Sequence, residues 1–454
     1  AITQSVSSSS LSAASLDVQA TNNADITLDN ANNNVATLTA SSRNAADDDT
    51  GSGVIRFTDK QDGLVIDGVV TTASAVLTAT AGAVTQTSAI DVGALALKGA
   101  GSFTLDDSAN KLPLIASEAT GAVSLSSSVA TTIGEVNPSG ITTGGANFSL
   151  TATAITVNNA IDTGAGLLAL TATAGGITQA DGSADITAAD IKLSATGNIS
   201  LLDSDNDFGA LAAVVSAANA TVTLVEDDGF DLAAVDGIAG IVTNAGAVSL
   251  TSSSIGLSTA TAVKTNSAGG AGADITLDGA VLVNQHSSFD AGSSAGDVLF
   301  KNSVDSTSAA GPYGLTVYSG AETRFDADVG ATTALDYLTT DAAGSVELAA
   351  VTVTTDNAQT FNDAVLLTGD VTLTSTADTI LLEGGVDGDT VDVGGTQTGS
   401  ERSLTINSAL TQNFTAAVGS APVNDKHGLG TVTINAACVT QTADGAVKAG
   451  ALAV

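Results

Sequence analysis

The feature that most constrains the fold of this chain is a set of internal repeats that return along its length. The string Leu-Thr-Ala-Thr-Ala-Gly occurs at 77–82 and again at 170–175, an offset of 93 residues. In both copies an aliphatic residue, Thr and Gln follow, ending at Gln86 and Gln179, and the same tripeptide ends at Gln4. Repeats of this kind predict either a solenoid or an array of similar domains.

A second group of repeats links distant parts of the sequence. The hexapeptide Ala-Asp-Ile-Thr-Leu-Asp occurs at 24–29 and at 273–278. In the C-terminal third, Leu-Thr-Val followed by Phe325 aligns with Leu-Thr-Ile followed by Phe414, at an offset of 89 residues. The repeat length therefore drifts, as expected when loops are inserted into a regular architecture.

Within each large repeat, short segments alternate between apolar and polar residues. Examples lie at 26–28 (Ile-Thr-Leu), 248–250 (Val-Ser-Leu) and 371–373 (Val-Thr-Leu), and clusters of Gly, Asn, Asp and Ser separate such segments. A period of two places the apolar side chains on one face of a β-strand. Because 43% of the residues are hydrophobic but only 3% are aromatic, the core must consist of Val, Leu, Ile and Ala. The sequence predicts an all-β protein.

Two all-β architectures can use such strands. In a right-handed parallel β-helix each turn takes roughly 20–25 residues and lies on the previous one, so a repeat is about four turns. The alternative is tandem immunoglobulin-like β-sandwiches, because about 100 residues is also one such domain. That fold favours a core Trp, and the chain has no Trp. We therefore predict one continuous β-solenoid over residues 1-454, with sub-regions 1-270 (Ile-Thr-Gln and Leu-Thr-Ala-Thr-Ala-Gly repeats) and 271-454 (Asn-Asp-Ala-Val repeats).

Three segments of the C-terminal half carry a family resemblance. They are Leu335-Asp-Tyr-Leu-Thr-Thr-Asp-Ala-Ala-Gly344, Val353-Thr-Thr-Asp356 and Gln359-Thr-Phe-Asn-Asp-Ala-Val365. Together with the Leu-Thr-Ala-Thr-Ala-Gly units, they resemble repeats of giant filamentous-haemagglutinin-like surface proteins. The resemblance implies a right-handed β-helix that is exported by a Gram-negative bacterium and acts as an adhesin or biofilm scaffold. Because no N-terminal secretion domain is recognisable, we expect the chain to be an interior piece of a longer protein.

The charge of the chain excludes some partners. The formal net charge is −36, with 12 basic residues, and 41 of the 48 acidic residues are Asp. Nucleic acids require clustered Lys and Arg, and anionic membranes would repel such a surface. No apolar run approaches the length of a membrane span, so we predict no membrane insertion. The excess of Asp over Glu favours turns over helices.

Acidic loops are the candidate metal sites. Asp203, Asp205 and Asp207 alternate as carboxylates do in calcium loops, but the positions that would require Gly and Glu differ. Asp387 and Asp389 form a second candidate. Further acidic runs lie at 47–49 and 226–228. We hypothesise that some of these loops bind Ca²⁺, and we predict no other cofactor.

No catalytic residues are predicted. His286 and His427 lie in polar segments that are typical of solvated loops, and Cys438, the single cysteine, follows two Ala residues where a small buried side chain is expected. No nucleophile elbow, phosphate loop or zinc-binding helix motif occurs in the sequence.

The few bulky side chains lie mainly between residues 313 and 337. Phe325 is predicted to be a stacked core residue, because its repeat partner is also Phe. Tyr313 and Tyr318 are hypothesised to form a small carbohydrate-contact patch, and Arg324 and Tyr337 lie nearby in sequence.

These observations predict an extracellular, non-catalytic stalk on a bacterial cell surface, for adhesion or biofilm scaffolding. The alternatives are a self-assembling filament or surface-layer subunit and a β-helix polysaccharide-active enzyme. Candidate partners are host or matrix glycans or proteins, and further copies of the chain through end-to-end self-association.

Overall fold

The computed structural model shows an all-β parallel β-solenoid of about 18 turns, with no helix among the residues it describes. Those residues are 1–4, 9–60, 63–180, 182–267, 269–349, 351–388, 391–393, 396–398, 402–414, 416–419, 429–441, 447 and 449–454. The predicted β-helix is confirmed. The immunoglobulin-like alternative is wrong, because the strands along the solenoid pair in parallel instead of antiparallel hairpins.

Two compact units divide the chain. Unit 1 comprises residues 1–211 and 225–227, and unit 2 comprises residues 212–224 and 228–454. The predicted change of repeat type at 270/271 lies inside unit 2.

The strands that begin in unit 1 are short, apart from a few that bend around a corner. They are β1 (Ile2–Thr3), β2 (Ser12–Ala13), β3 (Leu16–Ala20), β4 (Ile26–Leu28), β5 (Asn34–Val35), β6 (Thr37–Ser42), β7 (Ile55–Asp59), β8 (Leu64–Ala79), β9 (Ala83–Gly99), β10 (Ser102–Leu105), β11 (Leu114–Ala119), β12 (Val123–Ser126), β13 (Thr131–Ile133), β14 (Ile141–Thr142), β15 (Phe148–Ala152), β16 (Ile155–Val157), β17 (Ile161–Ala172), β18 (Ile177–Gln179), β19 (Ile186–Ala195), β20 (Ile199–Leu201) and β21 (Asp207–Ala218).

The remaining strands follow in unit 2, except that β22 ends on a residue of unit 1. They are β22 (Val222–Val225), β23 (Phe230–Leu232), β24 (Ala234–Val235), β25 (Ile238–Ala239), β26 (Ile241–Asn244), β27 (Val248–Leu257), β28 (Thr261–Lys264), β29 (Ile275–Val283), β30 (Ser287–Asp290), β31 (Val298–Phe300), β32 (Val304–Ser306), β33 (Leu315–Tyr318), β34 (Glu322–Phe325), β35 (Leu338–Thr340), β36 (Ser345–Leu348), β37 (Thr352–Thr355), β38 (Gln359–Phe361), β39 (Ala364–Leu367), β40 (Val371–Ser375), β41 (Ile380–Leu382), β42 (Val386–Gly388), β43 (Val391–Val393), β44 (Thr396–Thr398), β45 (Leu404–Phe414), β46 (Leu429–Gln441) and β47 (Ala449–Ala453).

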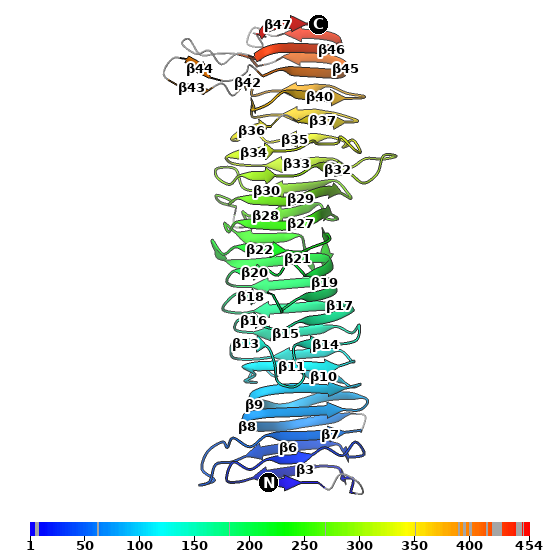
Figure 1. Ribbon diagram of the computed structural model, residues 1–454, viewed down its shortest axis with the longest axis vertical. Coiled ribbons are helices and arrows are strands. Elements are labelled where there is room, and N and C mark those ends of the chain that lie inside the picture. The colour runs from blue at the N-terminus through cyan, green and yellow to red at the C-terminus, as the bar shows by residue number, and fades with distance from the viewer. Residues whose placement is uncertain are drawn as a thin grey trace. The chain divides into compact units, whose positions relative to one another are not determined.

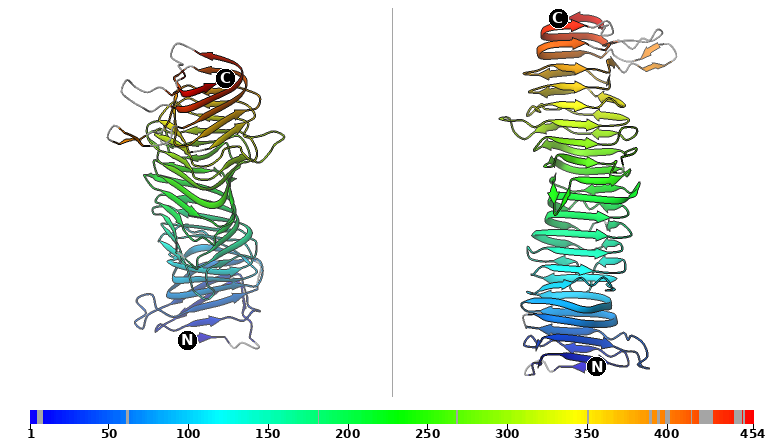
Figure 2. Two further views of the ribbon diagram at one scale, coloured as in Figure 1. Left: turned by 45° about the horizontal axis from the view of Figure 1, so that its top comes forward. Right: turned by 180° about the vertical axis from the view of Figure 1, so that it is seen from behind.

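One turn of unit 2 illustrates how the chain winds. β36, β37 and β38 form three successive sides of a turn, and β39, β40 and β41 form the next. Each strand pairs in parallel with its counterpart one turn later: β36 with β39, β37 with β40 and β38 with β41. Within each unit the arrows in Figure 1 therefore lie above one another, and the reverse view in Figure 2 shows the same stacking on the other side.

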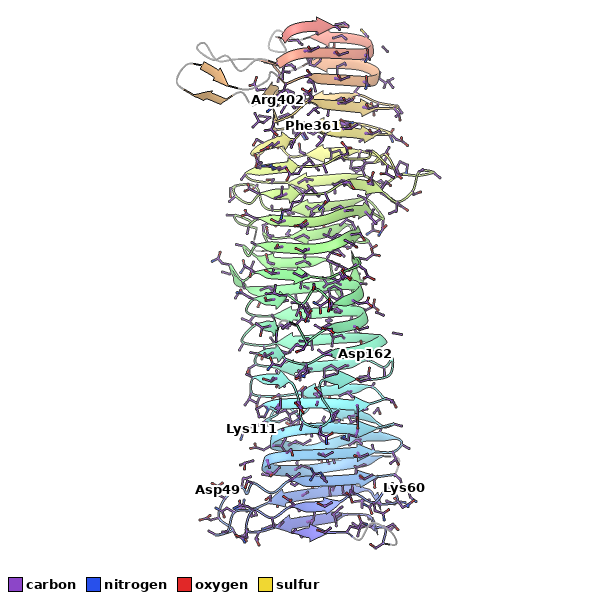
Figure 3. The ribbon with its side chains drawn as sticks, in the orientation of Figure 1. Asp49, Lys60, Lys111, Asp162, Phe361 and Arg402 are labelled. Atoms are coloured by element: carbon purple, nitrogen blue, oxygen red, sulfur yellow. The ribbon has the colours of Figure 1, made fainter. Side chains whose placement is uncertain are left out.

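The interior of each unit consists of stacked aliphatic rows. In unit 2, Val346, Val365 and Val386 follow one another in register on successive turns, and all three are buried. In β39 the neighbours of Val365, Ala364 and Leu366, point outward, as the period-two pattern predicts. Charged side chains such as Lys60 and Lys111 lie at the exposed turns in Figure 3. The aliphatic rows thus form a continuous core in each unit.

All ten Phe residues are buried. The ring of Phe300 stacks on that of Phe325, with centroids 4.8 Å apart and planes 5° apart, and meets the ring of Phe289 edge-on at 5.3 Å. The prediction that Phe325 is a stacked core residue is confirmed, and its repeat partner Phe414 is buried too.

Asp side chains link one turn to the next at the starts of strands. In both copies of the repeated hexapeptide, the carboxylate of the Asp before Ile accepts a hydrogen bond from a backbone N–H of the following turn. Asp25 Oδ1 accepts a hydrogen bond from the backbone N–H of Val54 at 2.8 Å, and Asp274 Oδ1 accepts one from Asp297 at 3.1 Å. Asp297 continues the series by accepting the N–H of Glu322 at 2.9 Å. The short Asp side chain reaches this N–H group, which explains part of the excess of Asp over Glu.

The Gln of the Ile-Thr-Gln repeats closes a buried corner. Gln and an Asn of the following turn exchange two side-chain hydrogen bonds, Nε2 to Oδ1 and Nδ2 to Oε1. The pairs are Gln4 with Asn33 (2.7 and 3.1 Å), Gln86 with Asn110 (2.8 and 3.0 Å) and Gln179 with Asn206 (2.7 and 3.1 Å). Each of these Asn residues ends a Leu-x-Asp/Asn-x-x-Asn segment in the sequence, at 28–33, 105–110 and 201–206.

The sequence repeat is out of phase with the turn. Starting at Val84, four turns pass through Phe103, Val123 and Phe148 to Leu168. The repeat equivalent of Val84 is Ile177, which lies on the next side of the solenoid, in register with Ile155 and Ile199. A repeat of 93 residues thus exceeds four turns by about one strand. This is possible because every side of the solenoid accepts the same apolar-polar-apolar strand.

Candidate functional site

Two of the predicted calcium ligands, Asp203 and Asp205, lie in one group with Asp185. One carboxylate oxygen from each lies within 4.8 Å of the other two. Asp203 is buried, and its oxygens accept hydrogen bonds from the backbone N–H groups of Asp205 at 3.2 Å and Gly182 at 3.0 Å. A Ca²⁺ ion at this group would be held by the three carboxylates, which come from two loops, one before β19 and one before β21. Calorimetric titration of the chain with Ca²⁺ tests this prediction.

The other predicted acidic ligands are not members of this group. Asp207 is the first residue of β21 and is exposed. In the run 226–228, Glu226 is buried whereas the next two acids are exposed. Asp387 is half-buried in β42 and lines a groove of about 250 Å³ with residues of β36 and β39, whereas Asp389 lies outside the described residues.

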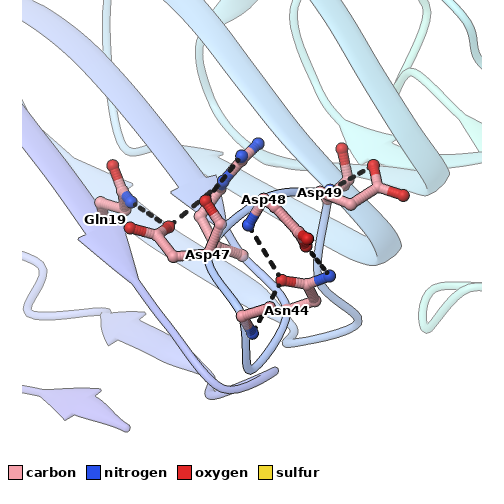
Figure 4. Close-up of polar contacts among 8 residues, drawn as sticks. Gln19, Asn44, Asp47, Asp48 and Asp49 are labelled. Atoms are coloured by element: carbon pink, nitrogen blue, oxygen red, sulfur yellow. Dashed lines mark hydrogen bonds and ion pairs between the residues drawn. The ribbon is translucent and has the colours of Figure 1, made fainter.

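The run of three Asp at 47–49 forms a hydrogen-bonded loop instead of a convergent ligand set (Figure 4). Asp47 Oδ1 accepts a hydrogen bond from Gln19 Nε2 at 2.8 Å, and Asp48 Oδ1 accepts one from Asn44 Nδ2 at 2.7 Å. Asp49 Oδ1 accepts the backbone N–H of the next residue at 2.7 Å. The three carboxylates therefore stabilise the loop, each with a different partner.

Cys438 is exposed, so the prediction that it is a small buried side chain is wrong. The reason is a register shift. β45 and β46 pair regularly until Ser408 and Ala436, and after an irregularity the pairing resumes with Thr411 opposite Cys438. The irregularity marks the corner between two sides of the turn, and it changes which residues of β46 point inward.

His286 is held by the backbone of the next turn. Its Nδ1 accepts a hydrogen bond from the N–H of Gly314 at 2.9 Å, and its Nε2 lies 3.9 Å from Asp336 Oδ2. Because Nδ1 is occupied as an acceptor, it is not available to take a proton from a nucleophile. His427 lies outside the described residues.

The aromatic residues are grouped differently from the prediction. Tyr318 is exposed at the end of β33. Tyr313 packs instead against His286, with ring centroids 5.8 Å apart, and His286 stacks on Tyr337 at 5.4 Å. Sequence reasoning missed this group because its members lie on three successive turns.

A row of acidic side chains crosses the outer face of unit 2. Asp274, Asp297 and Glu322, from successive turns, line a groove of about 190 Å³ together with Arg324. Burial, and then the neighbouring Glu347 carboxylate, raise the pKa of Glu322 above its usual range. Arg324 lies on the same strand as Glu322, two residues further along β34.

The Arg324 guanidinium is already paired on both sides. Its Nε lies 2.5 Å from Asp326 Oδ1, and Nη1 lies 3.5 Å from Glu347 Oε1. Glu347 Oε1 also accepts a hydrogen bond from Thr368 Oγ1 at 3.0 Å. The cation is thus held by carboxylates of its own chain.

Several Lys side chains form ion pairs with carboxylates on a neighbouring turn. Lys98 Nζ lies 2.9 Å from Glu118 Oε1, and Lys301 Nζ lies 3.0 Å from Asp278 Oδ2. Exposed pairs of this kind contribute little to stability. They nevertheless leave the outer surface dominated by acidic groups, in line with the net charge of −36.

No protein-family model, curated protein or solved structure matches the chain. In the part of the chain that the structure describes, no helix has the length and hydrophobicity needed to cross a membrane.

Proposed function

We propose that this chain is a non-catalytic stalk of a secreted bacterial surface protein of the filamentous-haemagglutinin type. The observation that carries the proposal is the parallel bonding of one turn to the next along the described residues of a unit. Parallel ladders join β36 to β39 and β39 to β42, and Asp caps such as that from Asp297 to Glu322 add side-chain bonds between turns. In such a solenoid each turn contacts only the turns before and after it, so the position of a turn and any force on it pass from turn to turn.

The use of the polar side chains supports a structural role. The Gln and Asn residues of the repeats close buried corners, and many Asp residues bind backbone N–H groups. Many of the other acidic groups among the described residues are exposed, where like charge keeps separate molecules apart. The resemblance of the Leu-Thr-Ala-Thr-Ala-Gly and Asn-Asp-Ala-Val repeats to filamentous-haemagglutinin-like proteins supports the location on a cell surface.

Three measurements on the purified chain test the stalk. We expect uniform protection of strand amides from hydrogen exchange within each unit, a monomer in sedimentation velocity, and no product from a panel of polysaccharides. Concentration-dependent polymers would contradict the stalk and favour a self-assembling filament. An antibody against the chain should also label intact cells that express it; labelling only after permeabilisation would contradict the surface location.

A β-helix polysaccharide-active enzyme is the second candidate function. It is favoured by the adjacent carboxyl groups of Glu322 and Glu347 beside Arg324, since acid–base catalysis on glycosides uses paired carboxyl groups. Release of reducing sugar that is abolished by Glu347→Gln, but retained in the Asp278→Asn control away from the groove, would establish this function and displace the stalk.

A further inference from the structure

Three of the aromatic rings near the surface of unit 2 lie together. All ten Phe residues are buried, and the chain has three Tyr and two His. Two of these Tyr, Tyr313 and Tyr337, lie with His286 and Asp336 in a cluster that we name the aromatic corner. It lies at the base of the loop between β32 and β33, which projects from the side of unit 2 in Figure 1.

A glycine allows the rings to meet. Ser287, Leu315 and Leu338 are in register on three successive turns, so the residues before them, His286, Gly314 and Tyr337, occupy equivalent positions. Side chains two turns apart would ordinarily be separated by about 10 Å. The rings of His286 and Tyr337 instead stack with centroids 5.4 Å apart and planes 13° apart.

Gly314 provides the space for this stacking. A Cβ atom at Gly314 would lie 2.3 Å from Cε1 of the Tyr337 ring. The ring therefore covers the glycine, and the N–H of the same glycine holds the imidazole by its hydrogen bond to Nδ1 at 2.9 Å. Tyr313 closes the corner from the side, edge-on to the imidazole at 5.8 Å with planes 84° apart.

The aromatic corner presents one hydrogen-bond donor, His286 Nε2–H, beside one acceptor, Asp336 Oδ2. Because Nδ1 of His286 accepts the Gly314 N–H, a neutral imidazole carries its proton on Nε2. Asp336 Oδ2 faces this N–H at 3.9 Å, which is too long for a hydrogen bond between them. The other oxygen, Oδ1, accepts a hydrogen bond from Asn357 Nδ2 at 2.6 Å, which fixes the carboxylate.

We infer that the aromatic corner is a binding subsite for a neutral sugar ring. One sugar hydroxyl donates to Asp336 Oδ2 and accepts from His286 Nε2–H, which bridges the gap between the two groups. The apolar face of the pyranose packs against Tyr313 and the exposed side of the imidazole, as C–H groups do on aromatic faces. The carboxylate at the centre repels uronic acids and other anionic sugars. This role goes beyond that of a stalk, which needs no ligand.

The absence of Trp gives the test a direct signal, because the fluorescence of the chain arises from three Tyr. The purified full chain is titrated with neutral oligosaccharides of glucose, galactose and N-acetylglucosamine, and with oligogalacturonate, while Tyr emission is followed. The expected result is saturable binding of a neutral oligosaccharide. Tyr313→Ala and His286→Ala each weaken it by about tenfold, the loss of one aromatic contact.

Matched variants separate the corner from the rest of the surface. Tyr318→Ala removes an exposed Tyr of the same strand region outside the corner and leaves the affinity unchanged. Gly314→Ala displaces the Tyr337 ring and abolishes binding while the β-type circular dichroism spectrum remains. Absence of binding to every neutral probe, equal loss in Tyr318→Ala, or preference for oligogalacturonate would overturn the assignment. Sedimentation and hydrogen exchange, which test the stalk, do not depend on these outcomes.

Discussion

Gln179 and Asn206 lie 27 residues apart in the chain and hold each other by two side-chain hydrogen bonds, Nε2 to Oδ1 at 2.7 Å and Nδ2 to Oε1 at 3.1 Å. The Asn206 Oδ1 atom also accepts the backbone N–H of Ile186 at 3.0 Å, and Gln179 Nε2 also donates to the carbonyl of Ala184 at 2.8 Å. Both side chains are buried. The pair therefore satisfies backbone groups at a corner where the strand ladders are interrupted.

Removing one member of this pair is expected to destabilise unit 1. Asn206→Ala removes both hydrogen bonds to the Gln179 side chain, which keeps its bond to the Ala184 carbonyl. It also leaves the Ile186 N–H without its side-chain acceptor, and we expect a total cost of about 2 kcal/mol in the free energy of unfolding. Urea unfolding followed by circular dichroism measures this cost. Asn158→Ala, at an exposed Asn of the same unit, is the control and should change the free energy by less than about 0.5 kcal/mol. Equal effects of the two substitutions would contradict the role of the corner.

Asp363 gives unit 2 a pH-dependent stability. Its side chain is 3% exposed, Oδ1 accepts a hydrogen bond from Thr340 Oγ1 at 2.7 Å, and burial raises its pKa from 3.8 to about 6. A raised pKa in the folded state means that the proton stabilises the fold at low pH. This contribution is lost as the pH rises through about 6.

The substitution Asp363→Asn tests this dependence. The variant should match the wild type near pH 4, where the carboxyl group is protonated, and should exceed it by about 3 kcal/mol near pH 8. Urea unfolding across that pH range gives the difference directly. A difference that is independent of pH would show that Asp363 is not buried in an ionisable form.

Cys438 should react in the folded state. Because its side chain is exposed, a thiol reagent such as Ellman's reagent is expected to modify it fully without denaturant. The absorbance of the released thiolate measures the extent of reaction. Modification only after unfolding would mean that β46 points this residue inward, as the sequence alone suggested.

The architecture was predictable because it depends on local patterns. Segments such as Val371–Ser375 alternate with period two, and their inward residues form the rows of the core. The phase of the turns was not predictable, because corner loops vary in length. Val84 and Ile177 are equivalent in sequence and yet lie on different sides of the solenoid.

Because the sequence does not show on which side of the solenoid a residue lies, it also does not show which distant residues come together in a site. His286, Tyr313 and Tyr337 come together only because residues 27 and 24 positions apart occupy neighbouring turns, and these separations depend on the loops between them. The Asp residues that bond to the next turn could have been found from the sequence. Each lies directly before the first aliphatic residue of a strand, as in Asp25-Ile26 and Asp274-Ile275. The Gln–Asn corners could have been found from another pattern, the Leu-x-Asp/Asn-x-x-Asn segment that follows the repeat.

The most direct test of the account is a set of distances between turns of unit 2. Ser249, Thr276, Leu299, Arg324, Glu347 and Leu366 form one outward row in register on six successive turns. In a Cys438→Ala background, spin labels at Ser249 and Leu366 are compared with labels at Thr276 and Leu366 by pulsed dipolar spectroscopy. The structure predicts narrow distributions centred at about 24 and about 19 Å, since turns are spaced by about 4.8 Å. Broad distributions, or distances that do not decrease by about one turn, would contradict a continuous stack of turns.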